Sequence, residues 1–344
     1  QEQAEEELEI DFPYEELEIG FNVSYVLDVL SAIKDEKVKL FLNRGVRKLR
    51  RDRFLKSLEK SSVKGFVKNL SFNNQQVSMY LPIEDVGLSR QLHFSSIREW
   101  RSTEFFIQLL TKKNYDQVID IGANLGYFVL IESLFSGAKI TAIEPVNFNF
   151  NLLKLNMTLN GIGTVDLRNL AVGDSNSDVT IYEFGQKNWS TVDLSHAQFL
   201  ESQGYKATKQ SVAQVTLDQL LSELPGSETG LLRMDVEGYE YEILSSSSLL
   251  KARSYDLFVE FHSNILGKKR SLELLESLRE NGYNNAVIIF NEEFSKEEQI
   301  FPYKDDLRVQ RLTLQNLVEK LGSETDETIK NNCGFELFLS KFDI

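Results

Sequence analysis

The sequence is poor in the residues that build disulfide frameworks and membrane spans. Its 344 residues include one cysteine, Cys333, so the chain cannot form an internal disulfide. No stretch is both long enough and free enough of charge to cross a bilayer. The acidic opening run also lacks the basic and apolar parts of a secretory signal. These features predict a cytoplasmic protein without a membrane partner.

Proline and basic residues are scarce too. Only 5 prolines occur and 42% of the residues are hydrophobic, so the chain can bury one large core or a core plus a small module. The 38 lysines and arginines are outnumbered by 52 aspartates and glutamates, for a formal net charge of −14. A surface of this sign repels phosphates, and we therefore do not expect nucleic acid as a partner.

The charge changes sign near residue 43. Residues 5–20 carry acids and no base, whereas residues 44–60 are dominated by arginine and lysine. A basic run can bind nucleic acid or a membrane surface, but it is more often a solvated helical face. We place a join here and take residues 43–62 as a basic linker or helix.

Beyond the join, strand-like runs alternate with helix-like segments. Residues 63–92 are typical of strands joined at an NNQQ turn, and residues 98–113 of a helix. Further strands are expected at QVIDIG, KITAIEP, VDLRNLAVG, GLLRMDV, YDLFVEF, NAVIIF and FELFLSK. This alternation predicts an α/β fold in which helices cover both faces of a mostly parallel sheet.

One turn of this pattern has the features of a cofactor site. The apolar run ending at Asp120 leads into Gly122-Ala123-Asn124-Leu125-Gly126. In such sheets ligands bind at the carboxyl ends of the strands, and glycine lets the backbone approach them closely. The spacing differs from the G-x-G-x-x-G of dinucleotide sites. The negative charge of Asp120 would oppose a phosphate and favour a cationic ligand.

A second carboxylate ends the following strand. Glu144 lies about twenty residues beyond the glycine turn, where an acidic side chain can accept hydrogen bonds from both hydroxyls of a ribose. Alone, Glu144-Pro145 could simply terminate a strand, but its spacing from the turn favours binding. A ribose without a phosphate cradle, beside acidic strand ends, predicts S-adenosylmethionine as the cofactor.

These segments together resemble a known family. VIDIGANLGYF, AIEPVNFNFNLLKLNMTLNG, NLAVGD, VTLDQLL, LLRMDVEGYEYEIL and LFVEFHS have the order and spacing of the FkbM family of S-adenosylmethionine-dependent methyltransferases. The resemblance covers residues 63–344. It implies a class I methyltransferase fold, which is Rossmann-like, with a seven-stranded sheet whose last strand is antiparallel, and methyl transfer to oxygen. The methyltransferase domain would span residues 111–344, with residues 63–110 as its N-terminal extension.

The resemblance also implies which residues bind the cofactor. Its methionine part would be surrounded by Asp120, Gly122, Asn124 and Gly126, with Ala123 and Tyr127 beside them. Glu144 and Pro145 would hold the ribose, and Ala171 would lie near the adenine. Asp235 would face the methionine ammonium or the reaction centre.

Methyl transfer to a hydroxyl is helped by a base that takes the proton. Glu260 and His262 share a face of an extended strand that should lie beside the strand ending at Asp235, so we expect His262 to be the base, with Glu237 second. A hydrogen-bonded structural role for His262 is the alternative. The same groups have the ligand types of a divalent metal site, as in catechol-type methyltransferases, but the sequence gives no geometry and we expect no metal.

Residues 184–210 form a polar insertion that the sheet pattern does not need. Insertions at the carboxyl edge often form lids or substrate walls, so Trp189 and Ser190 are candidates to touch the acceptor. The ring of Trp189 could stack on a sugar or anchor the loop in the core.

The N-terminus resembles a different protein. In EELEIGFNVSYVLDVLSAIKDEKVKLFL, a predicted strand, helix and strand follow one another as in the last domain of the bacterial DNA polymerase III beta sliding clamp. Residues 1–42 would be a small α+β fragment of that domain. The fragment lacks the parts that close a ring around DNA, so we expect no clamp function.

The sequence therefore predicts an S-adenosylmethionine-dependent O-methyltransferase that acts on a hydroxyl of a small molecule or glycan. Methylation of RNA or protein is a second hypothesis. It is weakened because Asp235-Val236-Glu237-Gly238 stands where enzymes that methylate base amino groups often carry an N-P-P-Y-like turn. The alternative from another functional class is a DNA-associated interaction protein, a hypothesis based on the clamp-like segment.

Overall fold

The computed structural model describes residues 64–85, 87–95, 97–184, 190–192, 194–226, 229–290, 309–331 and 334–342. All of them belong to one compact unit, Ser62–Ile344. The predicted clamp-like fragment (1–42) and basic segment (43–62) lie outside the described residues, as do Trp189 and Cys333.

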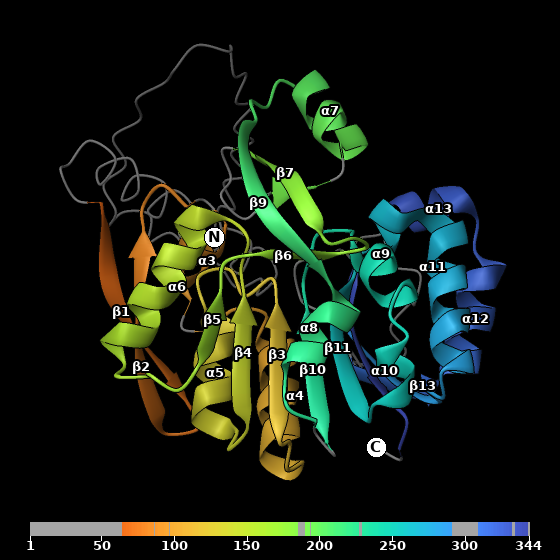
Figure 1. The fold of residues 1–344 in the computed structure, drawn as a ribbon, viewed down its shortest axis with the longest axis horizontal. Coiled ribbons are helices and arrows are strands. Elements are labelled where there is room, and N and C mark those ends of the chain that lie inside the picture. Colours follow the sequence, from red (N-terminus) through yellow and green to blue (C-terminus); the bar gives the residue numbers. More distant parts are fainter. Residues whose placement is uncertain are drawn as a thin grey trace, which may run out of the picture. The chain divides into compact units, whose positions relative to one another are not determined.

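An eight-stranded sheet forms the centre of this unit (Figure 1). Its strands, in spatial order, are β13 (Val309–Thr313), β12 (Asn285–Ile289), β14 (Phe335–Ser340), β11 (Tyr255–Phe261), β10 (Gly230–Met234), β3 (Gln117–Ile121), β4 (Lys139–Ile143) and β5 (Asp166–Arg168). The strands from β11 to β5 are parallel, whereas β14 is antiparallel to β11 and to β12. Seven strands thus have the predicted class I arrangement, with the last strand of the chain antiparallel. The edge strand β13 is an addition that the sequence analysis did not predict.

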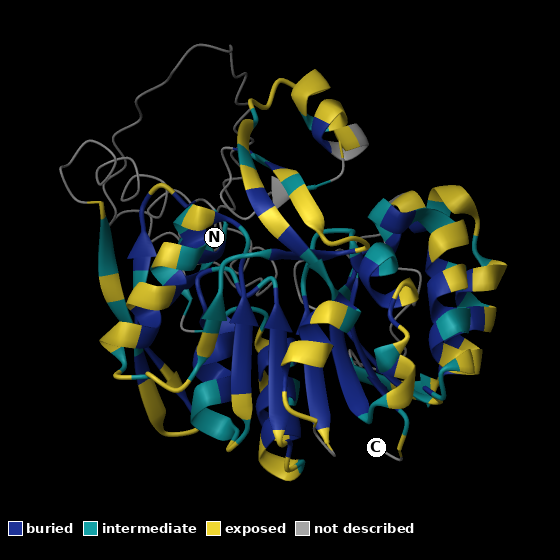
Figure 2. Cartoon of the chain, viewed as in Figure 1, coloured by how far each residue is buried: buried dark blue, intermediate teal, exposed yellow. Residues whose placement is uncertain are grey.

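Helices cover both faces of the sheet and leave its central strands buried (Figure 2). One face packs against α8 (Leu217–Glu223), α9 (Glu240–Ser245), α10 (Leu249–Ala252), α11 (Ser263–Glu280), α12 (Leu314–Ser323) and α13 (Asp326–Asn331). The other packs against α3 (Leu88–Phe94), α4 (Trp100–Lys112), α5 (Tyr127–Phe135), α6 (Asn147–Leu159) and the β1–β2 hairpin. Burial on both faces explains the nearly continuous apolar runs that identified these strands. Among the described residues, no helix combines the length and apolar character needed to cross a bilayer.

The segment before the main sheet folds as the sequence predicts. Strands β1 (Gly65–Phe72) and β2 (Gln75–Pro82) form an antiparallel hairpin. Its two turn residues, Asn73 and Asn74, have φ values of 43° and 67°, a left-handed conformation that asparagine tolerates. The predicted helix at 98–113 is α4, which packs against α5.

A second sheet departs from the predicted pattern. The run VDLRNLAVG, expected as one strand, divides into β5 and β6 (Ala171–Gly173). Strand β6 leaves the main sheet and joins β9 (Thr208–Thr216), β7 (Ser177–Glu183) and β8 (Ser190–Thr191) in the order β6-β9-β7-β8. The polar insertion at 184–210 therefore supplies β8, α7 (Leu194–Ser202) and the start of β9. Figure 1 shows this sheet lying across the carboxyl ends of β3, β4 and β10.

A buried ion pair links the two central strands beneath these carboxyl ends. Asp120 on β3 and Arg233 on β10 are register neighbours, and Arg233 Nη1 donates to Asp120 Oδ1 at 2.8 Å. Both side chains are almost fully buried, and the guanidinium lies 4.1 Å from the centre of the Phe128 ring on α5. Because each charge is removed from water, each depends on the other for compensation.

Replacing Arg233 with methionine should therefore destabilise the fold strongly. The change leaves Asp120 buried without its partner, which typically costs about 3–5 kcal/mol of unfolding free energy. Urea denaturation measures this loss. The matched control is Arg270→Met, which breaks the exposed Arg270–Glu242 pair and should cost about 1 kcal/mol or less. Equal losses of unfolding free energy in the two variants would mean that the buried pair stabilises the fold no more than the exposed pair does.

Candidate functional site

A pocket lies where the two sheets meet, at the carboxyl ends of β3, β4 and β10. Its described wall consists of Ile121, Gly122, Asn124, Ile143, Glu144, Pro145, Asn149, Leu170, Ala171, Val172, Ile181, Val192, Asp235, Val236, Glu237 and Tyr239. Main-sheet strands supply one side of this wall, and β6 and β7 supply another. The position agrees with the rule that open α/β sheets bind ligands beyond the carboxyl ends of their strands.

The glycine turn after β3 is shaped by contacts within the protein. Gly122 has φ +85°, and a Cβ atom there would lie 1.8 Å from the carbonyl oxygen of Asp235. Gly126 has φ +89°, and a Cβ would lie 2.6 Å from the Leu153 side chain on α6. We expected these glycines to make room for the ligand. Their first requirement is instead the close packing of the turn on β10 and α6, although Gly122 also lines the pocket.

Glu144 joins the glycine turn to the end of β4. Its Oε2 accepts from the Asn124 backbone N–H at 2.8 Å, and its Oε1 accepts from the Val146 N–H at 2.9 Å. The Asn149 side chain also hydrogen-bonds to this carboxylate, which keeps a remaining lone pair for a ligand hydroxyl. Burial raises the pKa of Glu144 to about 7, although the two backbone N–H groups oppose the rise. The side chain is therefore fixed in place and titrates near neutral pH.

The part of the pocket next to Glu144 is apolar. Its wall includes Ile143, Leu170, Ala171, Val172, Ile181 and Val192. Ala171 and Val172 belong to β6, and Ile181 belongs to β7, so the second sheet completes this end. Aliphatic side chains around a narrow space suit a flat heteroaromatic ring.

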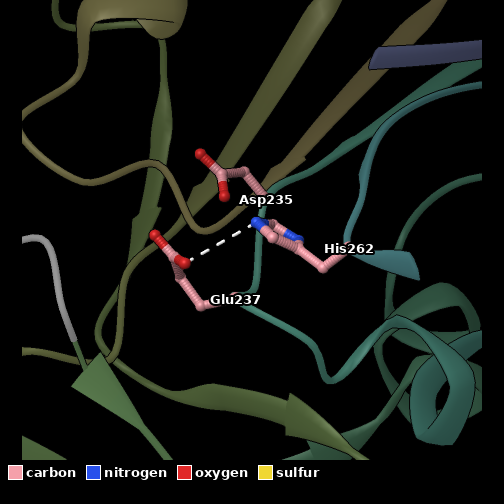
Figure 3. Close-up of side chains that lie close together, drawn as sticks. All are labelled: Asp235, Glu237 and His262. Carbon is pink, nitrogen blue, oxygen red and sulfur yellow. Dashed lines mark ion pairs between the residues drawn. The ribbon is translucent and has the colours of Figure 1, made fainter. Parts of the chain in front are cut away.

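The opposite end of the pocket is acidic. Asp235 follows β10, Glu237 adopts φ 51° in the next turn, and His262 begins the segment after β11 (Figure 3). The Nε2 atom of His262 lies 3.6 Å from Glu237 Oε2 and 3.6 Å from Glu260 Oε1. The strand that carries Glu260 lies beside the strand that leads to Asp235, as predicted. His262 was expected in the same extended strand, but it lies just after the end of β11 and still approaches Glu260.

Glu240 on α9 was not recognised from the sequence. Its carboxylate is fully buried, and Oε1 lies 2.7 Å from His262 Nδ1. Burial lowers the pKa of His262, but the carboxylates of Glu240, Glu260 and Glu237 outweigh it and hold that pKa well above its ordinary value. The last acid of the D-V-E-G-x-E motif was the available signal, because an acid three residues after Glu237 starts the helix that packs beside His262.

Glu237 differs from His262 in its access to the pocket. Its side chain is 38% exposed and lines the pocket, whereas His262 is 6% exposed and is not part of the described wall. Its surroundings raise the pKa of Glu237 to about 7, first through burial and then through Asp235 and Glu240, while His262 opposes the rise. A carboxylate with this pKa can take or give a proton near neutral pH.

Two further charged residues come from the segment before α4. Arg98 Nε donates to Glu99 Oε1 at 2.6 Å, and both side chains are largely buried. Burial lowers the pKa of Arg98, but the carboxylates of Glu99, Asp235 and Glu260 raise it by more. The guanidinium therefore stays charged beside the acidic end. Nothing in the sequence pattern brings this segment to the strand ends, and its contribution was missed.

The predicted cofactor residues divide into two groups. The pocket wall contains Gly122, Asn124, Glu144, Pro145, Ala171 and Asp235. The protein interior contains Asp120, Ala123, Gly126 and Tyr127, each packed or hydrogen-bonded within the protein. Of the two predicted substrate residues, Ser190 lies in β8, while Trp189 is outside the described residues.

The described wall fits S-adenosylmethionine. The aliphatic end suits its adenine, Glu144 offers acceptors for its ribose hydroxyls, and Asp235 and Glu237 place negative charge where its cationic part would lie. The pocket is formed by protein groups that already hold one another in place.

Comparison with known proteins separates the two parts of the chain. The methyltransferase FkbM domain family matches residues 120–284, and the C-terminal domain of the DNA polymerase III beta subunit matches residues 1–53. The beta sliding clamps of Proteus mirabilis and Escherichia coli (strain K12) are each 56% identical to this chain over 46 residues, 13% of its length. The chain spans 12% and 13% of the length of these clamps.

Three solved structures are similar to most of the chain. A human methyltransferase 10 domain containing protein has a TM-score of 0.38 and 15% identity, covering 78% of this chain and 89% of its own. A SAM-dependent methyltransferase from Agrobacterium tumefaciens has a TM-score of 0.37 and 10% identity, with coverages of 82% and 72%. A SAM-dependent O-methyltransferase from Thermotoga maritima has a TM-score of 0.35 and 14% identity, with coverages of 80% and 78%.

The family match begins at Asp120, includes the glycine turn, Glu144, Asp235 and His262, and ends at residue 284. These are the residues around which the pocket is built. The part of the chain that builds the pocket therefore matches the methyltransferase FkbM domain family, and the cofactor that this match implies is S-adenosylmethionine.

Proposed function

We propose that the protein is an S-adenosylmethionine-dependent O-methyltransferase that acts on a hydroxyl of a small molecule or glycan. The observation that carries the proposal is the position of Glu237, a partly exposed carboxylate on the pocket wall 3.6 Å from His262 Nε2, whose raised pKa suits proton transfer. When bound, the cofactor supplies an electrophilic methyl group on a positively charged sulfur.

A chain of buried charges would hold the cofactor end of the pocket. Asp120 holds Arg233 at 2.8 Å, and Arg233 Nη2 lies 3.5 Å from Asp235 Oδ2. Asp120 would therefore act as a positioning residue, through Arg233, while Asp235 faces the cationic part of the cofactor. The Asn124 N–H bonded to Glu144 keeps the ribose end in register with the glycine turn.

Glu237 is the better candidate for the base. We expected His262 in this role, but its carboxylate neighbours raise the pKa of its imidazole well above the ordinary value, and it is buried away from the described wall. In our proposal, Glu237 takes the hydroxyl proton, and the positive charge of His262 keeps the pKa of Glu237 from rising further. Glu240 holds His262 in this position.

An oxygen acceptor suits this site better than an amine. An amine beside Asp235, Glu237 and Glu260 would be stabilised as an ammonium ion, which has no free lone pair for the methyl group. A neutral hydroxyl needs a base instead, and Glu237 provides one. The carboxylates would also repel the phosphates of RNA or DNA.

Calorimetry with S-adenosylmethionine and with duplex DNA tests the proposal against the DNA-associated alternative. We expect saturable heat with the cofactor and none with DNA in moderate salt, because the acidic pocket attracts a cation and repels phosphate. A screen of sugar and small-molecule alcohols, read as conversion of the cofactor to S-adenosylhomocysteine, then identifies the acceptor class. Heat with DNA alone, or conversion only with an RNA or protein acceptor, would contradict the proposal.

Adenosine should bind more tightly as the pH rises from 6 to 8, because Glu144 loses its proton in this range and becomes the stronger acceptor for the ribose hydroxyls. Glu144→Gln should lose this pH dependence and weaken binding by about 1.5–3 kcal/mol, the usual worth of hydrogen bonds to a charged group. Adenosine has the ribose but no amino acid part, so the acidic end contributes little. Glu237→Gln is the control and should keep the dependence. Unchanged binding in Glu144→Gln would contradict the ribose assignment.

Glu237→Gln should lower turnover at saturating cofactor by about a hundredfold or more, because the base is lost. His262→Gln should leave a clear ascending limb in the pH–rate profile but move it to higher pH. The reason is that the imidazolium lowers the pKa of Glu237, and a neutral glutamine does not. If His262→Gln abolishes the ascending limb while Glu237→Gln retains it, the base is His262.

A further inference from the structure

Three potential ligand side chains meet at the acidic end of the pocket. Asp235, Glu237 and His262 each offer one donor atom, and these atoms lie within 4.8 Å of one another. They come from the segments that follow β10 and β11, so the main sheet fixes their spacing. In Figure 3 the three side chains converge on a common space.

The histidine in this group has one ring nitrogen held by a carboxylate, and its other ring nitrogen can bind an ion in exchange for its proton. Glu240 Oε1 lies 2.7 Å from Nδ1, whereas Nε2 has no hydrogen-bond partner in the described part of the chain. His262 is 6% exposed, and its Nε2 is directed at Glu237 and Glu260, at 3.6 Å from a carboxylate oxygen of each. A histidine that binds a metal almost always has its other ring nitrogen held by a carboxylate or carbonyl in this way.

The distances agree with ligands that share an ion. Nε2 lies 3.6 Å from a carboxylate oxygen of Glu237, which is too long for a hydrogen bond. Two atoms that each bind one ion at about 2.1 Å are separated by about 3–3.5 Å. A small closure of these side chains would therefore bring both atoms onto one ion.

The local charge also calls for a cation. A second group of carboxylates, Glu99, Glu260 and Glu336, has donor atoms within 4.8 Å of one another, next to the first group. Oδ1 of Asp235 and Oε1 of Glu336 are buried without a hydrogen-bond partner among the described residues.

The nearby arginines are already engaged. Arg98 is paired with Glu99, and Arg233 is shared between Asp120 at 2.8 Å and Asp235 at 3.5 Å. Only the first group adds a histidine and opens to the pocket, so it is the better place for an ion.

We propose that Asp235, Glu237 and His262 bind a divalent cation at the pocket wall, with Glu240 as the positioning residue for His262. The inference rests on the proposed function, because the ion would bind the acceptor hydroxyl beside the cofactor. It would withdraw electron density from that oxygen and ease transfer of the hydroxyl proton to the free oxygen of Glu237. Carboxylate and imidazole ligands together suit Mn²⁺ or Zn²⁺.

Electron paramagnetic resonance with Mn²⁺ alone tests this site in the full chain, since bound Mn²⁺ loses the sharp signal of the free ion. We expect one saturable site and a ¹⁴N coupling from His262. Asp235→Asn and His262→Gln should each weaken Mn²⁺ binding at least tenfold, and His262→Gln should abolish the ¹⁴N coupling. Glu240→Gln, which does not touch the ion, should weaken binding by about 10- to 100-fold because it releases the imidazole.

Two controls locate the ion and keep the test independent of folding. Glu237→Gln should also lower the affinity for Mn²⁺. The Glu237 side chain is partly exposed, so this variant should keep the fold, and circular dichroism checks that it does. Glu336→Gln changes the neighbouring carboxylate group and should affect binding less than His262→Gln does; the reverse order overturns the assignment.

Mn²⁺ should also bind when S-adenosylhomocysteine is present. Mutual exclusion of the two would overturn the proposal, since the ion would then occupy the cofactor's own place. Absence of Mn²⁺ binding by a chain that binds S-adenosylmethionine would overturn the metal site and leave the proposed function standing. A chain that binds Mn²⁺ as described but not the cofactor would instead contradict the proposed function.

Discussion

The burial of negative charge at the carboxyl edge of the main sheet is the constraint on which the site depends. Strand alternation turns Asp120, Arg233 and Glu260 toward the face covered by α4 and α5. Arg233 compensates Asp120 directly and lies 3.5 Å from Asp235, so one guanidinium connects the core of the sheet to the pocket wall. Without it, two central strands would each carry an uncompensated acid.

The nearby arginines cannot neutralise all of the remaining carboxylates. In the free protein some of these carboxylates therefore stay protonated near neutral pH. Burial raises the pKa of Glu144 and of Glu237 to about 7, and that of Glu336 to about 8. These folded-state values lie above the ordinary value, so the folded chain binds more protons than the unfolded chain. This contribution to stability is complete below the ordinary pKa and is lost as the pH rises through 7 to 8. A cationic ligand would replace those protons. The strength of its binding would therefore depend on how many of these carboxylates are ionised.

How much of the fold and of the site could be predicted depends on how far apart in the sequence the interacting residues lie. Strands β3, β4, β10, β11, β12 and β14 were evident because strands buried on both faces are nearly all apolar. Glu144 was evident because its spacing from the glycine turn follows from the strand–helix–strand unit. The division of VDLRNLAVG into β5 and β6 was not predicted, since a continuous β-like run gives no sign that its second half joins another sheet.

Side-chain partners from distant segments were the main omission. Arg98 reaches the acidic end from a segment before α4, and only the folded chain brings them together. Likewise, the sequence made His262 a free base because the carboxylate of Glu240, which holds its Nδ1, was not assigned a role. The sequence singled out Gly122 as part of a ligand-binding turn, but the Asp235 carbonyl that leaves no space for a Cβ could be seen only in three dimensions.

The central claim is that the acidic pocket holds protons in the free protein and exchanges them for the positive charge of the cofactor. Calorimetric titration with S-adenosylmethionine at pH 6.5, repeated in buffers of different ionisation enthalpy, measures the protons exchanged on binding. The account predicts net proton release, reduced in Glu144→Gln and in Glu237→Gln because each removes one group that titrates near neutral pH. Binding with no proton exchange, or with proton uptake, would contradict it.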